Sequence, residues 1–219
     1  MKFNKIDILA ILIICTILSC KNGTEKVKKG NLYENTSTST DSSKQIDRKG
    51  FHKSLPWKNF NFDVSTTGEG SIQQLEIQSY GLKNDNKKIS EEIEGSVTNA
   101  EIEDLNSDGF PEILIYKNSA GSGSYGNVIG YSINNGKSLS KIYFPPVSDN
   151  SKVKLGYMGR DEFNIVYKIL TQTFKNYNVG DKNSNPTGNI RQIQYKLEDG
   201  ESSRKFVVII LKNIQYNKI

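Results

Sequence analysis

The chain has 219 residues, of which 35% are hydrophobic and 24% are charged, and its formal net charge is +5. The hydrophobic share lies below the roughly 45–50% of an average domain, a figure that also counts glycine, so part of the chain is expected to lie outside any packed core. One histidine and two cysteines exclude a zinc cluster, a disulfide-stapled scaffold and most histidine-based catalysis.

The first residues, 1–19, have the pattern of a secretory signal peptide. Two lysines precede an apolar run over residues 8–18, and its length of about 11 residues is too short for a membrane-spanning helix, which needs about 20. The run ends in Ile-Leu-Ser-Cys, which resembles a bacterial lipobox and predicts that cleavage leaves Cys20 as a lipid-modified N-terminus. An ordinary signal peptide followed by a chance cysteine is the alternative.

Residues 20–50 have the composition of a flexible tether. They are rich in Ser, Thr, Asn and Lys, and their few apolar side chains show no period, so they cannot bury enough surface to offset the entropy of ordering. They carry seven basic and four acidic residues, whereas residues 51–219 carry 20 basic and 19 acidic ones. A nucleic-acid partner is therefore not expected, because the folded part has a net charge of only +1.

Residues 51–219 are expected to form one β-rich domain. Short apolar or alternating runs are separated by turn signals such as Asp108-Gly109 and Asn135-Gly136. This spacing predicts an all-β fold, predominantly antiparallel, in the form of a sandwich or a barrel-like sheet. The expected strands are residues 60–64, 72–77, 97–102, 112–116, 128–133, 139–144, 192–197 and 206–211.

The segment 163–174 fits two kinds of secondary structure. Its apolar residues match one face of a helix at positions 163, 166, 167, 170 and 174, and they match a strand at positions 163, 165, 167 and 169. The β-branched residues and the hairpin that follows favour the strand.

The segment from Asp104 to Glu112 begins like a calcium-binding loop. Oxygen-bearing side chains stand at alternate positions in Asp104, Asn106 and Asp108, and Gly109 suits a sharp turn. The twelfth position, where an EF-hand needs glutamate, holds isoleucine, so only a shorter loop completed by Glu112 or a backbone carbonyl could bind Ca²⁺. The preferred interpretation is a β-turn in which Asn106 and Asp108 cap local amides, and no cofactor is expected.

Residues 119–126, Ser-Ala-Gly-Ser-Gly-Ser-Tyr-Gly, form a loop of small residues between two expected strands. A phosphate-binding loop would need a lysine and a following helix, but a strand follows here. What remains is a narrow loop that can enter a cleft, where the hydroxyls of Ser122 and Tyr125 can donate charge-assisted hydrogen bonds to carboxylates of a partner. The alternative is a flexible linker with a core tyrosine.

Several segments, taken in their order along the chain, resemble the periplasmic inhibitors of invertebrate-type (i-type) lysozyme. The resemblance covers about 160 residues, from Phe60 to Leu211. The resemblance includes residues 65–72, 100–106, 119–126, 156–163 and 186–188. That family carries a Ser-Gly-x-Tyr loop that enters the lysozyme cleft. The resemblance implies a β-rich protein, often a homodimer, with no catalysis of its own and with a lysozyme-binding loop made of Gly121, Ser122, Gly123, Ser124, Tyr125 and Gly126.

These observations predict a proteinaceous inhibitor of an i-type lysozyme, held in the cell envelope by a lipid on Cys20. Familiar members of the family are soluble and periplasmic, whereas this chain is expected at the outer membrane, facing the periplasm or exposed at the surface. The runner-up is a calcium-dependent adhesion or glycan-binding lipoprotein built on residues 104–112. An enzyme is least favoured, because one histidine and no free mature cysteine cannot complete a Ser-His-Asp or Cys-His set.

Overall fold

A computed structural model describes residues 50–215, which form twelve β-strands and one short 3-10 helix. The expected signal peptide and lipidated cysteine, and all of the expected tether except residue 50, lie outside the described residues. No helix in the described range has the length and apolar character of a membrane span.

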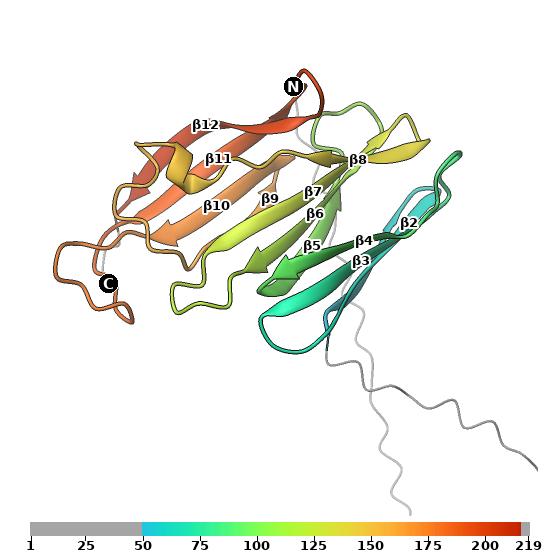
Figure 1. The fold of residues 1–219 in the computed structure, drawn as a ribbon. Helices are drawn as coiled ribbons and strands as arrows, with labels where there is room; N and C mark the ends of the chain where they lie inside the picture. The colour runs from blue at the N-terminus through green and yellow to red at the C-terminus, as the bar shows by residue number, and fades with distance from the viewer. Residues whose placement is uncertain (1–49, 216–219) are drawn as a thin grey trace, which may run out of the picture. The chain divides into compact units, whose positions relative to one another are not determined.

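The strands form three four-stranded sheets in which every pairing is antiparallel (Figure 1). The first sheet has the order β1-β2-β3-β4 and contains β1 (His52–Trp57), β2 (Phe60–Thr67), β3 (Ile72–Tyr80) and β4 (Ile89–Glu94). The middle sheet has the order β5-β6-β7-β8 and contains β5 (Ser96–Glu103), β6 (Glu112–Asn118), β7 (Gly126–Asn134) and β8 (Ser138–Ile142). The third sheet has the order β12-β11-β10-β9 and contains β9 (Glu162–Val166), β10 (Ile169–Lys175), β11 (Ile190–Glu198) and β12 (Lys205–Ile214). The 3-10 helix, η1, spans Val147–Asp149.

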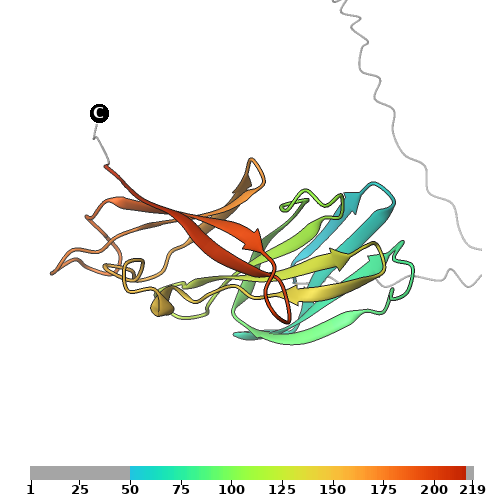
Figure 2. The ribbon, with the colours of Figure 1, turned by 90° about the horizontal axis from the view of Figure 1, so that it is seen from above.

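The middle sheet is buried on both faces. In β6, Ile113 and Ile115 pack with the first sheet, whereas Leu114 and Tyr116 pack with the third. Successive side chains of a strand point to opposite faces, so a strand covered on both sides needs a continuous apolar run. The run Ile-Leu-Ile-Tyr meets this need, and Figure 2 shows the green and yellow strands between the cyan and the red ones.

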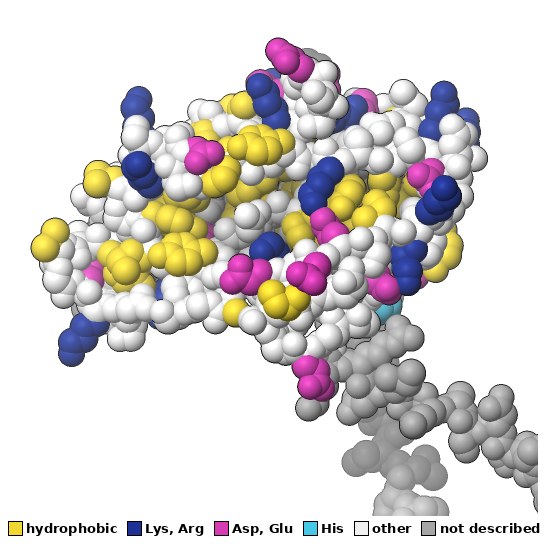
Figure 3. Space-filling model, viewed as in Figure 1, with side chains coloured by type: hydrophobic (Ala, Val, Ile, Leu, Met, Phe, Trp, Pro, Cys, Tyr) yellow, Lys and Arg dark blue, Asp and Glu magenta, His cyan; other side chains and the backbone are white. Residues whose placement is uncertain are grey.

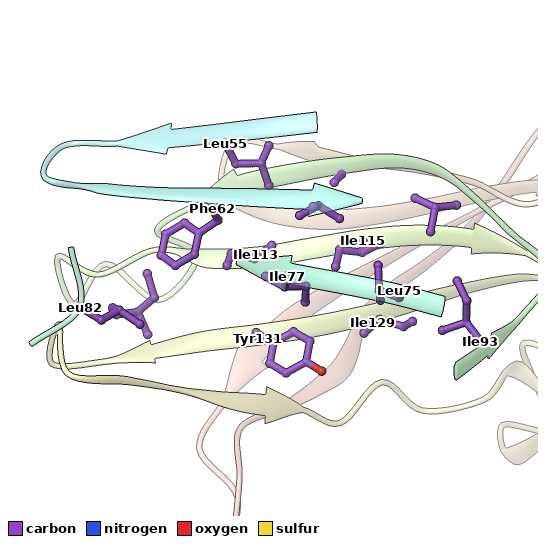
Figure 4. Close-up of a cluster of buried hydrophobic side chains, with 14 residues drawn as sticks. Leu55, Phe62, Leu75, Ile77, Leu82, Ile93, Ile113, Ile115, Ile129 and Tyr131 are labelled. Atoms are coloured by element: carbon purple, nitrogen blue, oxygen red, sulfur yellow. The ribbon is translucent and has the colours of Figure 1, made fainter. Parts of the chain in front are cut away.

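The core between the first and middle sheets is mainly aliphatic (Figure 4). Phe62, Leu75 and Ile77 are completely buried in it, and they lie against Ile115 and Ile129 of the middle sheet. Burying one such side chain contributes about 1.5–3 kcal/mol. A one-residue slip of β2 or β3 would turn these side chains toward solvent, so this core fixes the register of the first sheet.

The core between the middle and third sheets is rich in aromatic rings. The ring centroid of Phe144 lies 5.1 Å from that of Tyr195 and 6.1 Å from that of Phe206. Tyr116 stacks on Phe163 with ring centroids 5.6 Å apart. The two sheets are also joined at one edge, where the Phe206 backbone N donates to the carbonyl oxygen of Tyr143 at 2.9 Å. The all-β, predominantly antiparallel fold class expected from the sequence is confirmed.

Segment 163–174 is strand rather than helix, but it belongs to two strands. β9 ends at Val166 and β10 begins at Ile169, so only Tyr167 and Lys168 form the turn, with φ of +49° and +64°. Two-residue turns with positive φ usually contain Asn or Gly, and the absence of both residues at 167–168 explains why no turn was predicted here. β1 and β4 are also absent from the strands expected above.

Candidate functional site

Residues 119–126 connect β6 to β7 as a closed loop at one end of the middle sheet. Asn118 pairs with Gly126 at its base, and the Ser119 backbone N donates to the Tyr125 carbonyl at 2.9 Å. The Ser119 hydroxyl accepts from the Tyr125 backbone N at 3.0 Å. Inside the loop, the Ser124 backbone N donates to the carbonyl of Gly121 at 2.9 Å. The loop is therefore held by its own hydrogen bonds, which favours an ordered loop over the flexible linker of the alternative interpretation.

The tip of this loop presents two side-chain hydroxyls to solvent. Ser122 is exposed, and Tyr125 is 46% exposed although its ring is in contact with the protein. Within residues 50–215, neither the Ser122 hydroxyl nor the Tyr125 phenol has a hydrogen-bond partner. Both hydroxyls can therefore donate to a partner molecule without first breaking a bond inside the protein.

The two central glycines of the loop differ in the space around them. A Cβ placed on Gly123 would lie 2.6 Å from Cε2 of the Tyr125 ring, whereas a Cβ on Gly121 would meet nothing within 4 Å. Gly123 is thus covered by the Tyr125 ring, and any larger residue there would push the ring away from its present position.

The Tyr125 ring packs against Tyr157, and both rings border a hollow. Tyr157 meets the ring edge-on with centroids 5.6 Å apart. A hollow of about 400 Å³ lies beside them, and its lining includes Phe144, Val147 and Lys154. In the space-filling view, hydrophobic side chains gather toward the end of the face where the loop and the segment after η1 lie (Figure 3). A further loop approaches the tip where Asn183 Nδ2 donates to the Ser122 carbonyl at 3.5 Å.

The sequence assigned no role to residues 156–163 beyond their part in the family resemblance. The structure places residues 157–161 against the 119–126 loop, where the Arg160 backbone N donates to the carbonyls of Gly123 and Ser124 at 3.1 Å each. The only sequence signal was the Gly-Tyr-Met-Gly-Arg-Asp stretch, which has no regular periodicity. Such a stretch predicts a turn, but it does not predict that the turn contacts the 119–126 loop.

The candidate calcium ligands lie together at the opposite end of β6, but their oxygens already have partners. Asp104 is buried, and its carboxylate accepts from the backbone N of Asp108 at 3.1 Å and of Gly109 at 3.2 Å. Asn106 Nδ2 donates to Asp108 Oδ2 at 3.0 Å, and the Phe110 backbone N donates to Asp108 Oδ1 at 2.8 Å. These contacts support the β-turn interpretation of the segment.

The Arg204 guanidinium group pairs with two of the carboxylates that a bound calcium ion would need. Arg204 donates to Asp108 Oδ2 at 2.7 Å and to Glu112 Oε1 at 2.9 Å, and Glu112 is completely buried. Burial raises the pKa of Glu112, and hydrogen bonds from Ser132 and the Leu105 backbone only partly offset that. Burial also acts to raise the pKa of Asp108, but hydrogen bonds from the Phe110 backbone, Asn106 and Arg204 outweigh it and leave the pKa lowered.

This arrangement does not favour calcium, because the ion would have to displace an arginine that is paired with two carboxylates. No group of three or more His, Cys, Asp or Glu side chains in residues 50–215 is arranged to hold a metal ion. His52, the one histidine, is exposed at the start of β1.

Residues 88–152 match the family model described as periplasmic lysozyme inhibitor of I-type lysozyme. The matched segment contains the middle sheet and both of the loops described above. The family resemblance expected from the sequence is therefore confirmed for these residues, and it supports a role as a lysozyme inhibitor. The family is periplasmic by description and consists of inhibitors rather than enzymes. No curated protein and no solved structure matches the chain.

Proposed function

We propose that this protein inhibits an I-type lysozyme by inserting the 119–126 loop into the active-site cleft of that enzyme. The family match over residues 88–152 supports the choice of partner. The observation that carries the mechanism is the pair of exposed hydroxyls, on Ser122 and Tyr125, which have no hydrogen-bond partner among the described residues although their backbone is held in place.

The chemistry of the target suits this loop. Glycoside hydrolysis of peptidoglycan uses a pair of carboxyl groups that face each other across a cleft. Hydroxyl groups that donate to carboxylates form charge-assisted hydrogen bonds, which are about twice as strong as those between neutral groups. The small residues around Ser122 and Tyr125 let the tip enter a narrow cleft, and the Tyr125 ring adds rigid contact area. The loop blocks the substrate sites without a chemical step, and no hydrolytic activity of its own is proposed.

The experiment is a cell-wall lysis assay with an I-type lysozyme and increasing amounts of inhibitor. We expect stoichiometric inhibition of the I-type enzyme and much weaker inhibition of chicken-type and goose-type lysozymes. Tyr125→Ala removes the ring and its hydroxyl, and a loss of about 2 kcal/mol is typical of such an anchor. Ser122→Ala removes one hydrogen bond to a charged group, which is worth about 1.5–3 kcal/mol. Each change should weaken inhibition about tenfold or more.

Two matched controls separate the loop from surface effects in general. Tyr80 is 48% exposed at the end of β3, so Tyr80→Ala removes a tyrosine of nearly the same exposure as Tyr125. Ser202→Ala removes an exposed serine between β11 and β12. Both controls should inhibit like the wild-type protein. The proposal is wrong if no I-type lysozyme is inhibited, or if the Ser122→Ala, Tyr125→Ala double variant inhibits unchanged.

We also propose that the inhibitor domain is tethered to the outer membrane through a lipid on Cys20. The lipobox-like end of the signal sequence and the polar residues 20–50 support this. A flexible tether of about 30 residues has a root-mean-square reach of roughly 30 Å, which keeps the domain near peptidoglycan. Radiolabelled palmitate should enter the full-length protein, and Cys20→Ala should abolish the label and leave an unprocessed precursor. Normal processing of that variant would contradict the anchor.

A homodimer, which the family resemblance implies for many members, stays a prediction. Sedimentation of the purified protein at several concentrations would test it, since a monomer at all concentrations would contradict it.

A further inference from the structure

We infer that residues 157–161 form a cradle that holds the 119–126 loop in its binding shape, and that Tyr157 and Asp161 are positioning residues of the inhibitory site. The inference rests on the proposed function, because positioning matters only if the loop is what binds the lysozyme. These residues belong to neither strand that flanks the loop, and they lie just before β9.

The cradle approaches the loop closely through backbone atoms. The Arg160 backbone N is shared between the carbonyls of Gly123 and Ser124, at 3.1 Å from each. Gly159 has a φ of +85°, and a Cβ on this residue would lie 2.1 Å from the Gly123 carbonyl oxygen. No other residue type fits there without moving the loop, since the obstacle is backbone and not a flexible side chain.

Asp161 fastens the point where the loop enters β7. Its Oδ2 accepts from the Gly126 backbone N at 2.7 Å and from the Tyr157 hydroxyl at 2.7 Å. Its Oδ1 accepts from Gln172 Nε2 of β10, whose Oε1 in turn accepts from the Tyr195 hydroxyl of β11. Asp161 is only 7% exposed, and the bond from Gln172 ties its carboxylate to the third sheet.

Gly126 allows this carboxylate to come so near. A Cβ on Gly126 would lie 2.5 Å from the Cβ of Asp161 and 2.7 Å from the Phe163 ring. The Gly126 N–H therefore reaches a buried carboxylate, and such charge-assisted bonds are stronger than neutral ones.

Tyr157 connects this carboxylate to the exposed anchor of the loop. Its ring packs edge-on against Tyr125 at 5.6 Å and against Phe174 of β10 at 4.6 Å, while its hydroxyl donates to Asp161. Burial, followed by the nearby Asp161 carboxylate, raises the pKa of Tyr157, so its hydroxyl keeps the proton that it donates. Tyr157 thus holds the Tyr125 ring in place, while Tyr125 is the residue that contacts the lysozyme.

Such a cradle strengthens binding by removing freedom before the encounter. A loop that is ordered only on binding loses conformational entropy at that moment, and a preformed loop avoids that cost. Weakening the cradle should therefore lower the affinity although every atom of the loop itself is unchanged.

The experiment compares Asp161→Asn and Tyr157→Phe with the wild-type protein. An asparagine offers one acceptor oxygen where three donors converge, and phenylalanine keeps the ring but loses the donated bond. Tyr131→Phe is the matched control, because the Tyr131 hydroxyl donates to Glu91 at 3.2 Å in the other core. Two quantities are measured: the inhibition constant for an I-type lysozyme, and amide hydrogen exchange at Gly126 and Tyr125 in the absence of lysozyme.

We expect Asp161→Asn to weaken inhibition and to accelerate exchange at Gly126, each about tenfold or more, while Tyr157→Phe has a smaller effect of the same sign. Tyr131→Phe should change neither quantity. Unchanged exchange at Gly126 in both cradle variants would overturn the inference, and so would faster exchange with unchanged inhibition. If Asp161→Asn does not fold, Tyr157→Phe alone decides between these outcomes.

The failure of the inference can be told apart from failure of the proposed function. If the wild-type protein inhibits no I-type lysozyme, the proposed function fails, and the positioning role falls with it even where exchange at Gly126 responds to the variants. If the wild-type protein inhibits and the cradle variants inhibit equally well, only the inference is overturned.

Discussion

The two loops at the ends of β6 both carry polar side chains, and they use these groups in opposite ways. In residues 104–112, the carboxylates accept hydrogen bonds from local backbone amides and from Arg204. In residues 119–126, the backbone is equally well held, yet the hydroxyls of Ser122 and Tyr125 have no partner among the described residues. A loop of the first kind uses its polar groups within the fold, whereas one of the second kind leaves its donors available to another molecule.

The largest expected effect is on the first loop and concerns stability alone. Glu112→Ala would leave Arg204 without its buried partner and the Leu105 amide without its acceptor. Breaking a buried ion pair from one side costs about 3–5 kcal/mol. At about 2–4 °C per kcal/mol for a chain of this size, the melting temperature should fall by roughly 6–20 °C.

Thermal melting followed by circular dichroism measures this change, and Glu92→Ala, at an exposed position of β4, is the control that should melt like the wild-type protein. Inhibition by the folded variant at low temperature should be unchanged. A loss of inhibition that exceeds the loss of folded protein would mean that the two loops are not independent.

The second loop should show the reverse behaviour, a loss of inhibition without a loss of stability. Gly123→Ala adds a Cβ within 2.6 Å of the Tyr125 ring and must displace it, whereas Gly121→Ala adds one in open space. We expect Gly123→Ala to weaken inhibition about tenfold, or about 1.4 kcal/mol, and to melt within about 2 °C of the wild-type protein. Gly121→Ala is the matched control, and equal inhibition by both variants would contradict the role of the Tyr125 position.

A smaller effect should depend on pH. Hydrogen bonds to the Phe110 amide, Asn106 and Arg204 outweigh the effect of burial and hold the pKa of Asp108 below its ordinary value of 3.8. The stability that this carboxylate contributes is therefore present above pH 3.8 and is lost as the pH falls toward the lowered pKa. The Asp108 side chain is 33% exposed, so about 1 kcal/mol or less is expected after screening by solvent.

Urea unfolding of the wild-type protein and of Asp108→Asn at pH 6 and at pH 3 measures this contribution. The wild-type protein should be the more stable of the two at pH 6, and the difference should shrink at pH 3. A difference that is the same at both pH values would show that the Asp108 charge is not involved.

The smallest expected effect is that of calcium on the first loop. Because Arg204 is paired with Asp108 and Glu112, adding Ca²⁺ or a chelator should shift the melting temperature by less than about 1 °C. A rise of several degrees with Ca²⁺ would mean that the ion displaces Arg204 and would revive the calcium-dependent interpretation.

The features that depend on neighbouring residues were predictable from the amino-acid sequence. Alternating and β-branched runs predicted the all-β fold and most of its strands, and the continuous apolar run at 113–116 belongs to a strand buried on both faces. Small residues between two such runs located the 119–126 loop. These features are local because side-chain period and turn chemistry act over a few residues.

The way those segments are used was not predictable, because it depends on contacts between residues that are distant in sequence. Arg204 lies 96 residues from Asp108, and Asp161 lies 35 residues from Gly126. The turn at Tyr167-Lys168 has positive φ without glycine or asparagine, so it is imposed by the pairing of β9 with β10 and not by its own residues. Local pattern can locate a loop, but the partners of its polar groups, and hence its function, depend on which distant strand lies beside it.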